Sequence, residues 1–296
     1  MMRADVRAWP AKLSALTSRS IVPLLLLLAT GWAVWILAQA PGELRLTRGG
    51  LAIAWRFLAS AVTPAVTYQS DVPAGTPPLI GKALAAAETT LTFAAAATSL
   101  ALAGGLVLGF LASSAWWSGD PVRAASAGTR ARRLAGPAVY GATRVVIAVL
   151  RSIHELLWAV LLLAAFGLGH LTAVLAIAIP YAGILAKVFS EIVDETPRDA
   201  ALALRGAGSS ALQMYCFGLL PRALPDLCAY ALYRFECAIR SSAVLGFFGF
   251  PTLGYYIAAS FDNLLYGEVW TYLYVLFGLV AIMDWWSGAL RRRFVA

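Results

Sequence analysis

The sequence predicts an all-α membrane protein with six transmembrane helices, and three observations support this fold class. Hydrophobic residues make up 60% of the 296 residues and charged residues only 13%, whereas an average soluble domain contains about 25% charged residues. The mean hydropathy is +0.76. Six apolar segments are long enough to cross a hydrocarbon core of about 30 Å; they are residues 21–38, 84–111, 145–166, 171–189, 227–248 and 269–286.

The distribution of basic residues predicts the orientation of these spans. The net charge is +8, and the segments that are cytoplasmic when the N-terminus lies inside hold 16 of the 23 basic residues, against four outside. A bias of this kind fixes the orientation of a membrane protein. We therefore expect a multi-pass protein of the bacterial inner membrane with both termini in the cytoplasm. No nucleic-acid partner is expected, because the sequence contains no nucleic-acid recognition module.

Residues 1–80 and 81–296 are expected to have different roles. The apolar run 21–38 is longer than a usual signal-peptide core and no clear cleavage site follows it, so we expect it to remain as an anchor span. The remainder of 1–80 is expected to be periplasmic, and 81–296 to form the core transmembrane domain. The three cysteines form no C-x-x-C pair, which argues against a disulfide framework.

A polar segment at 190–225, between the fourth and fifth spans, is expected to lie in the cytoplasm. Pro197 after Thr196 predicts a helix start, with Thr196 as the N-cap and the helix continuing to about Leu204. Glycines should then break this helix, and a second short helix should run from Ser209 or Ser210 to about Phe217.

Within this segment the sequence resembles the permeases of ABC importers, whose cytoplasmic signature reads E-A-A-x-x-x-G, nine residues, then I-x-L-P. Four residues match the signature: Ala203 stands at the first Ala, Gly208 at the Gly, and Leu220 and Pro221 at the final Leu and Pro. Three positions differ: Leu202 replaces the acidic residue, Leu204 the second Ala, and Gly218 the Ile. The resemblance implies a type I ABC importer permease fold, with this element as the coupling helix that docks on an ATP-binding subunit. Asp199, on nearly the same helical face as Leu202, would then supply the missing charge.

Two clusters of ionisable residues fall inside predicted spans, where each such residue costs about 2.5–3.5 kcal/mol on insertion scales. Arg151, His154 and Glu155 share one face of the third span, at positions i, i+3 and i+4. In the fifth span we expect Glu236 to pair with Arg240, as Arg151 would with Glu155. Arg234 then needs another partner, either Glu155 or an anion. Two hydroxyl residues, Ser241 and Ser242, follow Arg240.

Both clusters belong to motifs that resemble those of phosphonate-, phosphite- and hypophosphite-type permeases. The stretch that begins at Arg151 (RSIHELLWAVLLLAAFGLG) resembles their third-span motif, and the one that begins at Tyr233 (YRFECAIRSSAVLGFFG) their fifth-span motif, with Ala238 where Asn is usual. The resemblance implies an ATP-driven importer of a phosphorus oxyanion. It also implies three kinds of partner: a second copy of this chain, two ATP-binding subunits and a periplasmic substrate-binding protein.

The chemistry of the clusters agrees with that substrate, because arginine donates a planar fork of hydrogen bonds that suits phosphorus oxyanions. The predicted pathway residues are Arg151, His154, Glu155, Arg234, Glu236, Arg240, Ser241 and Ser242. The alternative is that these charges pair only with each other and hold the third and fifth spans together. The residue types alone do not decide between the two.

Other function classes fit the sequence less well than the importer. No G-x-x-x-x-G-K-[ST] run is present, so ATP and Mg would be bound by the partner ATPase and no cofactor by this chain. An intramembrane enzyme is disfavoured, because H-E at 154–155 is followed by Trp158 where a zinc protease has its second histidine; His154 and Glu155 alone are too few for a metal site. A secondary carrier would show inverted repeats, and the sequence shows none. An importer of amino acids or vitamins remains the nearest alternative.

Overall fold

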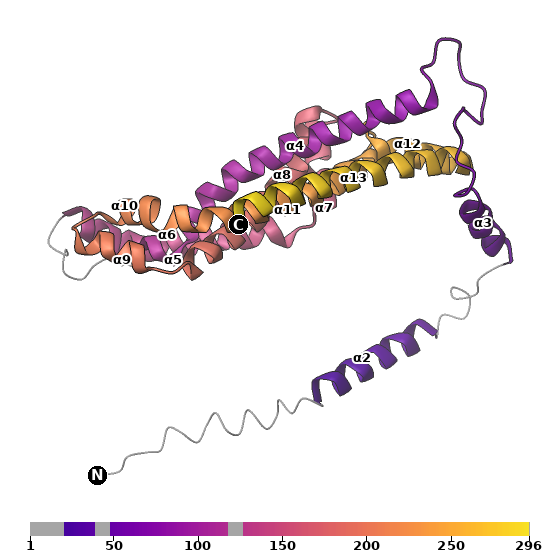
Figure 1. The fold of residues 1–296 in the computed structure, drawn as a ribbon. Coiled ribbons are helices and arrows are strands. Elements are labelled where there is room, and N and C mark those ends of the chain that lie inside the picture. Colours follow the sequence, from indigo (N-terminus) through magenta and orange to yellow (C-terminus); the bar gives the residue numbers. More distant parts are fainter. Residues whose placement is uncertain (1–20, 39–47, 118–126, 296) are drawn as a thin grey trace. The chain divides into compact units, whose positions relative to one another are not determined.

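The computed structural model describes residues 21–38, 48–117 and 127–295, and every regular element in these ranges is helical (Figure 1). The basic residues of positions 1–20, on which part of the predicted orientation depends, lie outside the described residues. The chain divides into two compact units, residues 1–58 and 59–296. The first unit contains α2 (Ile21–Ala38), whose apolar side chains are exposed, and most of α3 (Arg48–Ala59).

The second unit contains the core, and its helices follow one another in this order: α4 (Leu79–Ala112), α5 (Ser114–Trp117), α6 (Ala127–Ser152), α7 (Glu155–Phe166), α8 (His170–Glu195), α9 (Asp199–Gly206), α10 (Ala211–Gln213), the π-helical turn η2 (Met214–Leu219), α11 (Leu220–Val244), the 3-10 turn η3 (Leu245–Phe248), α12 (Leu253–Asp262) and α13 (Tyr266–Val295). The long helices α4, α8, α11 and α13 run alongside one another (Figure 1). Helices α9 and α10 lie at one end of this unit, and the loop 63–78 lies at the other.

Several of these helices can cross a membrane. Among the described residues α4, α8 and α13 are each long and apolar enough to do so alone. Two bent pairs, α6 with α7 and α11 with α12, bring the number to as many as five if each pair forms one span. The apolar part of α2, Pro23–Ile36, is shorter. The chain is therefore a multi-pass membrane protein, while the count of six spans stays a prediction.

The third predicted span is not one continuous helix, which corrects the expectation for 145–166. Helix α6 ends at Ser152, α7 starts at Glu155, and the two are bent by 91°. The residue between them that caps α7 is His154, whose Nδ1 accepts a hydrogen bond from Leu156 N at 3.3 Å. A polar side chain that bonds the local backbone competes with the helical ladder, so the polar Ser152–Glu155 stretch breaks the apolar run.

Close packing between α4 and α8 forms the centre of the second unit. With alanine in place of Gly105, the added Cβ would lie 2.7 Å from Leu185 Cβ, and a Cβ at Gly109 would lie 3.1 Å from Phe189 Cβ. The α4 face on this side is otherwise rich in buried alanines. Small residues of this kind let two membrane helices approach closely. Helix α8 is therefore packed closely against α4 along this face.

The first short helix of the predicted coupling loop is present with shifted boundaries. Helix α9 begins at Asp199, and its N-terminus has no side-chain cap. Thr196 is not the predicted N-cap; its Oγ1 donates to Ile192 O at 2.7 Å and so belongs to the end of α8. A threonine in the last turn of a helix readily reaches the carbonyl four residues back. Gly208, at φ +89°, follows α9 in the left-handed region where the sequence predicts a break.

The second short helix starts as predicted and ends differently. Ser210 caps α10, since its Oγ accepts from Gln213 N while the Gln213 side chain accepts from Ser210 N. The helix does not stop near Phe217, because the π turn η2 leads directly into α11. Pro221 lies in the first turn of α11. The loop thus returns as the start of a long helix.

Candidate functional site

The polar residues predicted in the third and fifth spans meet where α6 breaks into α7. Ser241 on α11 donates a hydrogen bond from Oγ to Glu155 Oε1 at 2.9 Å, across to the first turn of α7. The same Oγ lies 2.9 Å from the hydroxyl of Tyr181, in the middle of α8. Three helices therefore converge on one hydrogen-bonded chain, Glu155–Ser241–Tyr181. We call this chain, together with Arg234, the break cluster.

Arg234 reaches the break cluster from α11. Its guanidinium carbon lies 4.2 Å from the centre of the Tyr181 ring, a cation–π contact. Its Nε is buried without a hydrogen-bond partner, and none of its nitrogens donates to a residue that the structure describes. Guanidinium carries five N–H donors, and a buried donor that makes no hydrogen bond costs about 1–3 kcal/mol. The cluster thus holds a positioned cation whose donors are free to bind an anion.

The predicted pairs within each span do not form. Glu236 is 9% exposed and accepts a hydrogen bond at 3.1 Å from Nη2 of Arg291, on α13, instead of from Arg240. Arg240 is exposed, and its Nη2 donates to Cys237 Sγ at 3.5 Å. Glu155 has His154 Nε2 at 3.5 Å rather than Arg151. The bend explains the last difference, because Arg151 and Glu155 no longer lie one turn apart on a single helix.

The remaining predicted pathway residues have unequal surroundings. Arg151 is exposed at the end of α6, and no carboxylate among the described residues lies within ion-pair distance of it. His154 is also open, with 64% of its side chain exposed. Ser242 is fully buried, and its Oγ donates to Thr90 O on α4 at 2.7 Å. Ser242 therefore joins two helices and does not face the break cluster.

Tyr181 is the member of the break cluster that sequence reasoning missed. It lies inside the apolar fourth span, directly after Pro180, and no charge marks it. The sequence feature that could have indicated Tyr181 is a hydroxyl within an otherwise apolar run, next to a proline inside a helix. Tyrosine combines a ring face for a cation with a hydroxyl that needs a buried partner.

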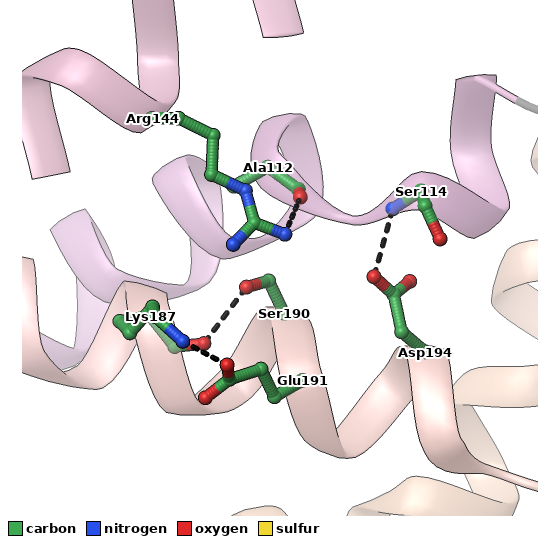
Figure 2. A network of polar contacts seen from close by, with 7 residues as sticks. All are labelled: Ala112, Ser114, Arg144, Lys187, Ser190, Glu191 and Asp194. Atoms are coloured by element: carbon green, nitrogen blue, oxygen red, sulfur yellow. Dashed lines mark hydrogen bonds and ion pairs between the residues drawn. The ribbon is translucent and has the colours of Figure 1, made fainter. Parts of the chain in front are cut away.

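A second polar cluster lies at the end of α8, near α5 (Figure 2). Asp194 accepts hydrogen bonds from Ser113 Oγ at 2.6 Å, from Ser114 N at 3.0 Å and from Ala115 N at 3.2 Å. Beside it, Arg144 donates from Nη2 to Ala112 O at 3.1 Å, and Lys187 pairs with Glu191. Both oxygens of Asp194 are satisfied by the start of α5, so this carboxylate fastens α4 and α5 to α8.

The predicted coupling residues form an exposed surface around α9. Ala203 and Leu202 are exposed, whereas Ala201 is buried under Gly218, where a Cβ would come within 2.9 Å of the Ala201 Cα. Asp199 lies 3.8 Å from Arg222, with both side chains exposed. A pair of this kind contributes little to stability. The small residue at 218 is required because η2 packs directly on α9.

The last two coupling residues lie at the start of α11. Leu220 packs against the main hydrophobic core, and Pro221 is exposed beside it. Nearby, Leu202, Leu212 and Phe217 are 56%, 50% and 72% exposed. Large apolar side chains exposed together in this way are typical of an interaction surface. Among the described residues no group of three His, Cys, Asp or Glu side chains is placed to hold a metal ion.

The chain matches the family model described as binding-protein-dependent transport system inner membrane component, over residues 124–296. The chain belongs to this family. The matched segment contains the break cluster, the Glu236–Arg291 pair and the whole loop around α9. The residues singled out for function therefore fall within the part of the chain that defines the family.

Relatives with reviewed names are similar over part of the chain. The phosphite transport system permease protein PtxC of Stutzerimonas stutzeri is 36% identical over 161 residues, which cover 53% of this chain and 58% of that protein. The phosphate-import permease protein PhnE of Mycolicibacterium smegmatis is 33% identical over 159 residues, covering 54% of this chain and 30% of that protein. The matches thus span only part of the length of these relatives.

Solved structures share the fold at low sequence identity. A methionine ABC transporter, MetNI, in an inward-facing conformation gives a TM-score of 0.59 with 20% identity, over 74% of this chain and 99% of that one. An amino acid ABC transporter with histidines gives 0.57 with 15% identity, over 72% and 94%. These likenesses show an ABC importer permease fold.

Proposed function

We propose that this chain is the permease subunit of an ATP-driven importer for a phosphorus oxyanion such as phosphite, hypophosphite or a phosphonate. Two copies would line the pathway, two cytoplasmic ATPases would drive it, and a periplasmic binding protein would deliver the substrate. The observation that carries the proposal is Arg234, a positioned guanidinium without a hydrogen-bond partner in the break cluster. The named relatives supply the phosphorus chemistry.

The break cluster has the parts that a transient oxyanion site needs. Arg234 offers a fork of donors that matches two oxygens of a tetrahedral anion. The hydroxyls of Ser241 and Tyr181 lie beside it, and the N-terminus of α7 adds favourable partial charge at the bend. Glu155 opposes this attraction with its negative charge, which limits the affinity. A pathway must bind its substrate weakly enough to release it, and high affinity would reside in the binding protein.

The surface around α9 would couple this site to ATP hydrolysis. The exposed face that holds Leu202 and Ala203 is suited to dock on an ATPase by apolar contact, and Asp199 and Arg222 provide charges at its edge. Helix α8 ends where this loop begins, and α11 begins where it ends. Movement of the loop would therefore be transmitted to the break cluster through these two helices. Gly208→Arg combined with Ala203→Trp is expected to abolish ATPase coupling while leaving the chain in the membrane; unchanged transport would contradict the docking assignment.

The substrate class is tested by growth on single phosphorus sources. A strain that lacks this gene is grown on phosphite, hypophosphite, methylphosphonate or phosphate, and is rescued with the wild-type chain or with Arg234→Gln. We expect loss of growth on at least one reduced or organic phosphorus source, rescue by the wild type, and no rescue by the variant. Equal growth of the deletion strain and wild type on all four would reject the phosphorus substrate and favour an importer of another specificity.

The proposed orientation has its own test. Both termini should lie in the cytoplasm, in keeping with the excess of basic residues in the proposed inside segments. Alkaline phosphatase fused after residue 296 should be inactive in intact cells, and the same reporter inserted in the 63–78 loop should be active. The opposite pattern would reverse the topology, and with it the assignment of the α9 surface to the ATPase.

A further inference from the structure

A pocket separate from the break cluster is formed in part by the 63–78 loop, which lies at one end of the second unit (Figure 1). Its volume is about 350 Å³, within the range of small-molecule sites. Its walls come from three places: Thr76 and Pro77 of the loop, the first turns of α4 around Lys82, and the segment that holds Pro251 and Tyr256. In the proposed orientation this end faces the periplasm.

The pocket contains one cation. Lys82 Nζ lies 4.7 Å from the centre of the Tyr256 ring and 5.6 Å from that of Tyr68, and no carboxylate of the described residues lies within ion-pair distance of it. The hydroxyls of Thr76 and Thr89 already donate to backbone carbonyls, at 2.7 and 3.0 Å. Lys82 is therefore the group in this pocket that offers charged N–H donors to a ligand.

The two tyrosines that flank Lys82 are held in place. Tyr256 stacks on the fully buried Tyr272, with ring centres 5.6 Å apart and planes inclined by 19°. The Tyr68 hydroxyl donates to Pro77 O at 2.9 Å. Burial raises the pKa of Tyr68, and the negative charge of Glu268 raises it further, so the hydroxyl stays protonated and keeps this bond. The cation and its surroundings are thus organised before any ligand arrives.

The remaining walls are apolar, which restricts the class of ligand. Pro77, Ala85, Ala86 and Pro251 present hydrocarbon, and a fully hydrated inorganic ion would leave this surface in contact with water. A ligand with an anionic head for Lys82 and an apolar part for these walls satisfies both.

We propose that this pocket binds an organic phosphorus anion, with its oxygens on the Lys82 ammonium and its alkyl part against Ala85 and Pro251. The choice of phosphorus rests on the proposed function. The anion has two sources, a free alkylphosphonate arriving for transport or the headgroup of an anionic phospholipid in the outer leaflet. The pocket shares no residue with the break cluster, so it is a second site on the same chain.

The test measures binding of two probes by the full chain in nanodiscs made of phosphatidylcholine. Methylphosphonate is titrated by ³¹P line broadening, and phosphatidylglycerol retention is counted by native mass spectrometry. All samples carry Arg234→Gln, so binding at the break cluster does not contribute. Lys82→Gln is expected to weaken one of the two probes by at least about tenfold, because a hydrogen bond to a charged group is worth about 1.5–3 kcal/mol. Lys187→Gln is the matched control, since Lys187 lies on α8, outside the pocket, and pairs with Glu191.

Ala85→Leu provides an independent variant, because Ala85 is exposed to the pocket and the larger side chain fills it without removing the charge. Loss of methylphosphonate binding in both pocket variants supports the free anion, and loss of phosphatidylglycerol supports the lipid. Binding of both probes unchanged in both variants overturns the proposal, even if binding-protein-dependent uptake falls. The binding measurements do not depend on Arg234, because every sample carries Arg234→Gln. If the proposed function alone is wrong, the pocket still binds its probe while the transporter shows no uptake of a phosphorus substrate.

Discussion

Two polar side chains of helix α8, Asp194 and Tyr181, have different surroundings. Asp194, in its last turn, has both carboxylate oxygens satisfied by Ser113 and the first backbone N–H groups of α5. Tyr181, in its middle, shares a hydroxyl contact with Ser241 and a ring face with Arg234, which donates no hydrogen bond to the described residues. Arg144, near Asp194, also has an unpaired Nε, but its Nη2 donates to Ala112 O.

The difference separates a structural polar group from a candidate binding group. Buried polar groups in folded proteins nearly always find partners. Where the chain satisfies a charge from neighbouring helices, as at Asp194, the charge joins those helices. Where the chain positions a guanidinium against an aromatic ring and leaves its donors unmade, as at Arg234, a ligand is the expected partner. Asp194 lies on α8, and Arg234 contacts the same helix through the Tyr181 ring. Variants of Asp194 and Arg234 should therefore affect different properties.

The largest expected effect is that of Arg234→Gln on transport. Removing the charge should reduce kcat/KM for uptake of the phosphorus substrate roughly 10- to 100-fold, because a charge-assisted hydrogen bond is worth about 1.5–3 kcal/mol. The measurement is uptake of labelled substrate into proteoliposomes with the complete transporter. Arg234→Lys should recover only part of the activity, since it keeps the charge without the planar fork. A Tm reduced by Arg234→Gln with kcat/KM unchanged would assign Arg234 to structure.

Asp194→Ala should have the opposite pattern. Three donors at the start of α5 lose their acceptor, and we expect the free energy of unfolding to fall by about 1–3 kcal/mol. Thermal unfolding in detergent, followed by fluorescence, measures this change. KM for the substrate should stay at the wild-type value in the protein that remains folded. A raised KM with an unchanged Tm would remove the contrast between the two clusters.

The close packing of α8 against α4 is tested at Gly105. Gly105→Ala would place a Cβ 2.7 Å from Leu185 Cβ, and overpacking of this kind typically costs about 1–3 kcal/mol. Gly278→Ala is the matched control, because a Cβ there meets nothing within 4 Å. We expect the Tm to fall for the first variant and to stay or rise for the second. Equal Tm values for the two would show that α4 and α8 do not pack as described.

The smallest effects should come from two adjacent serines of α11. Ser241 belongs to the break cluster, whereas Ser242 is buried against Thr90 O. Ser241→Ala should raise KM several-fold, as expected for loss of about 1 kcal/mol, with little change in Tm. Ser242→Ala should lower the Tm and leave KM unchanged. If the two variants have the same effects, the boundary drawn between the site and its support is wrong.

Sequence patterns predicted several of the apolar helices and three residues of the break cluster, Glu155, Arg234 and Ser241, since apolar length and intramembrane charge are local signals. The α6–α7 break escaped them because the charges of Arg151, His154 and Glu155 also fit one face of a continuous helix. The His154 side chain caps α7 and so places the break, and a hydropathy pattern does not detect such a cap.

Partner choice was the other limit of the sequence. Glu236 was expected to pair one turn away, at Arg240, but it pairs with Arg291, 55 residues later, and Glu155 with Ser241, 86 residues away. Contacts at such separations depend on how the helices pack. Tyr181 gave no charge signal within its apolar span. The Lys82 pocket likewise depends on three segments that meet only in the folded chain.

The central claim, that Arg234 binds the substrate anion in the break cluster, is tested most directly by a distance. The reconstituted transporter, with ¹⁵N-labelled arginine and methylphosphonate held under turnover-blocking conditions, is measured by ¹⁵N–³¹P dipolar recoupling. A guanidinium bonded to a phosphonate oxygen places nitrogen about 4 Å from phosphorus. The account predicts a recoupled arginine signal that disappears in Arg234→Gln. A signal that persists in that variant, or a wild type without one, would contradict it.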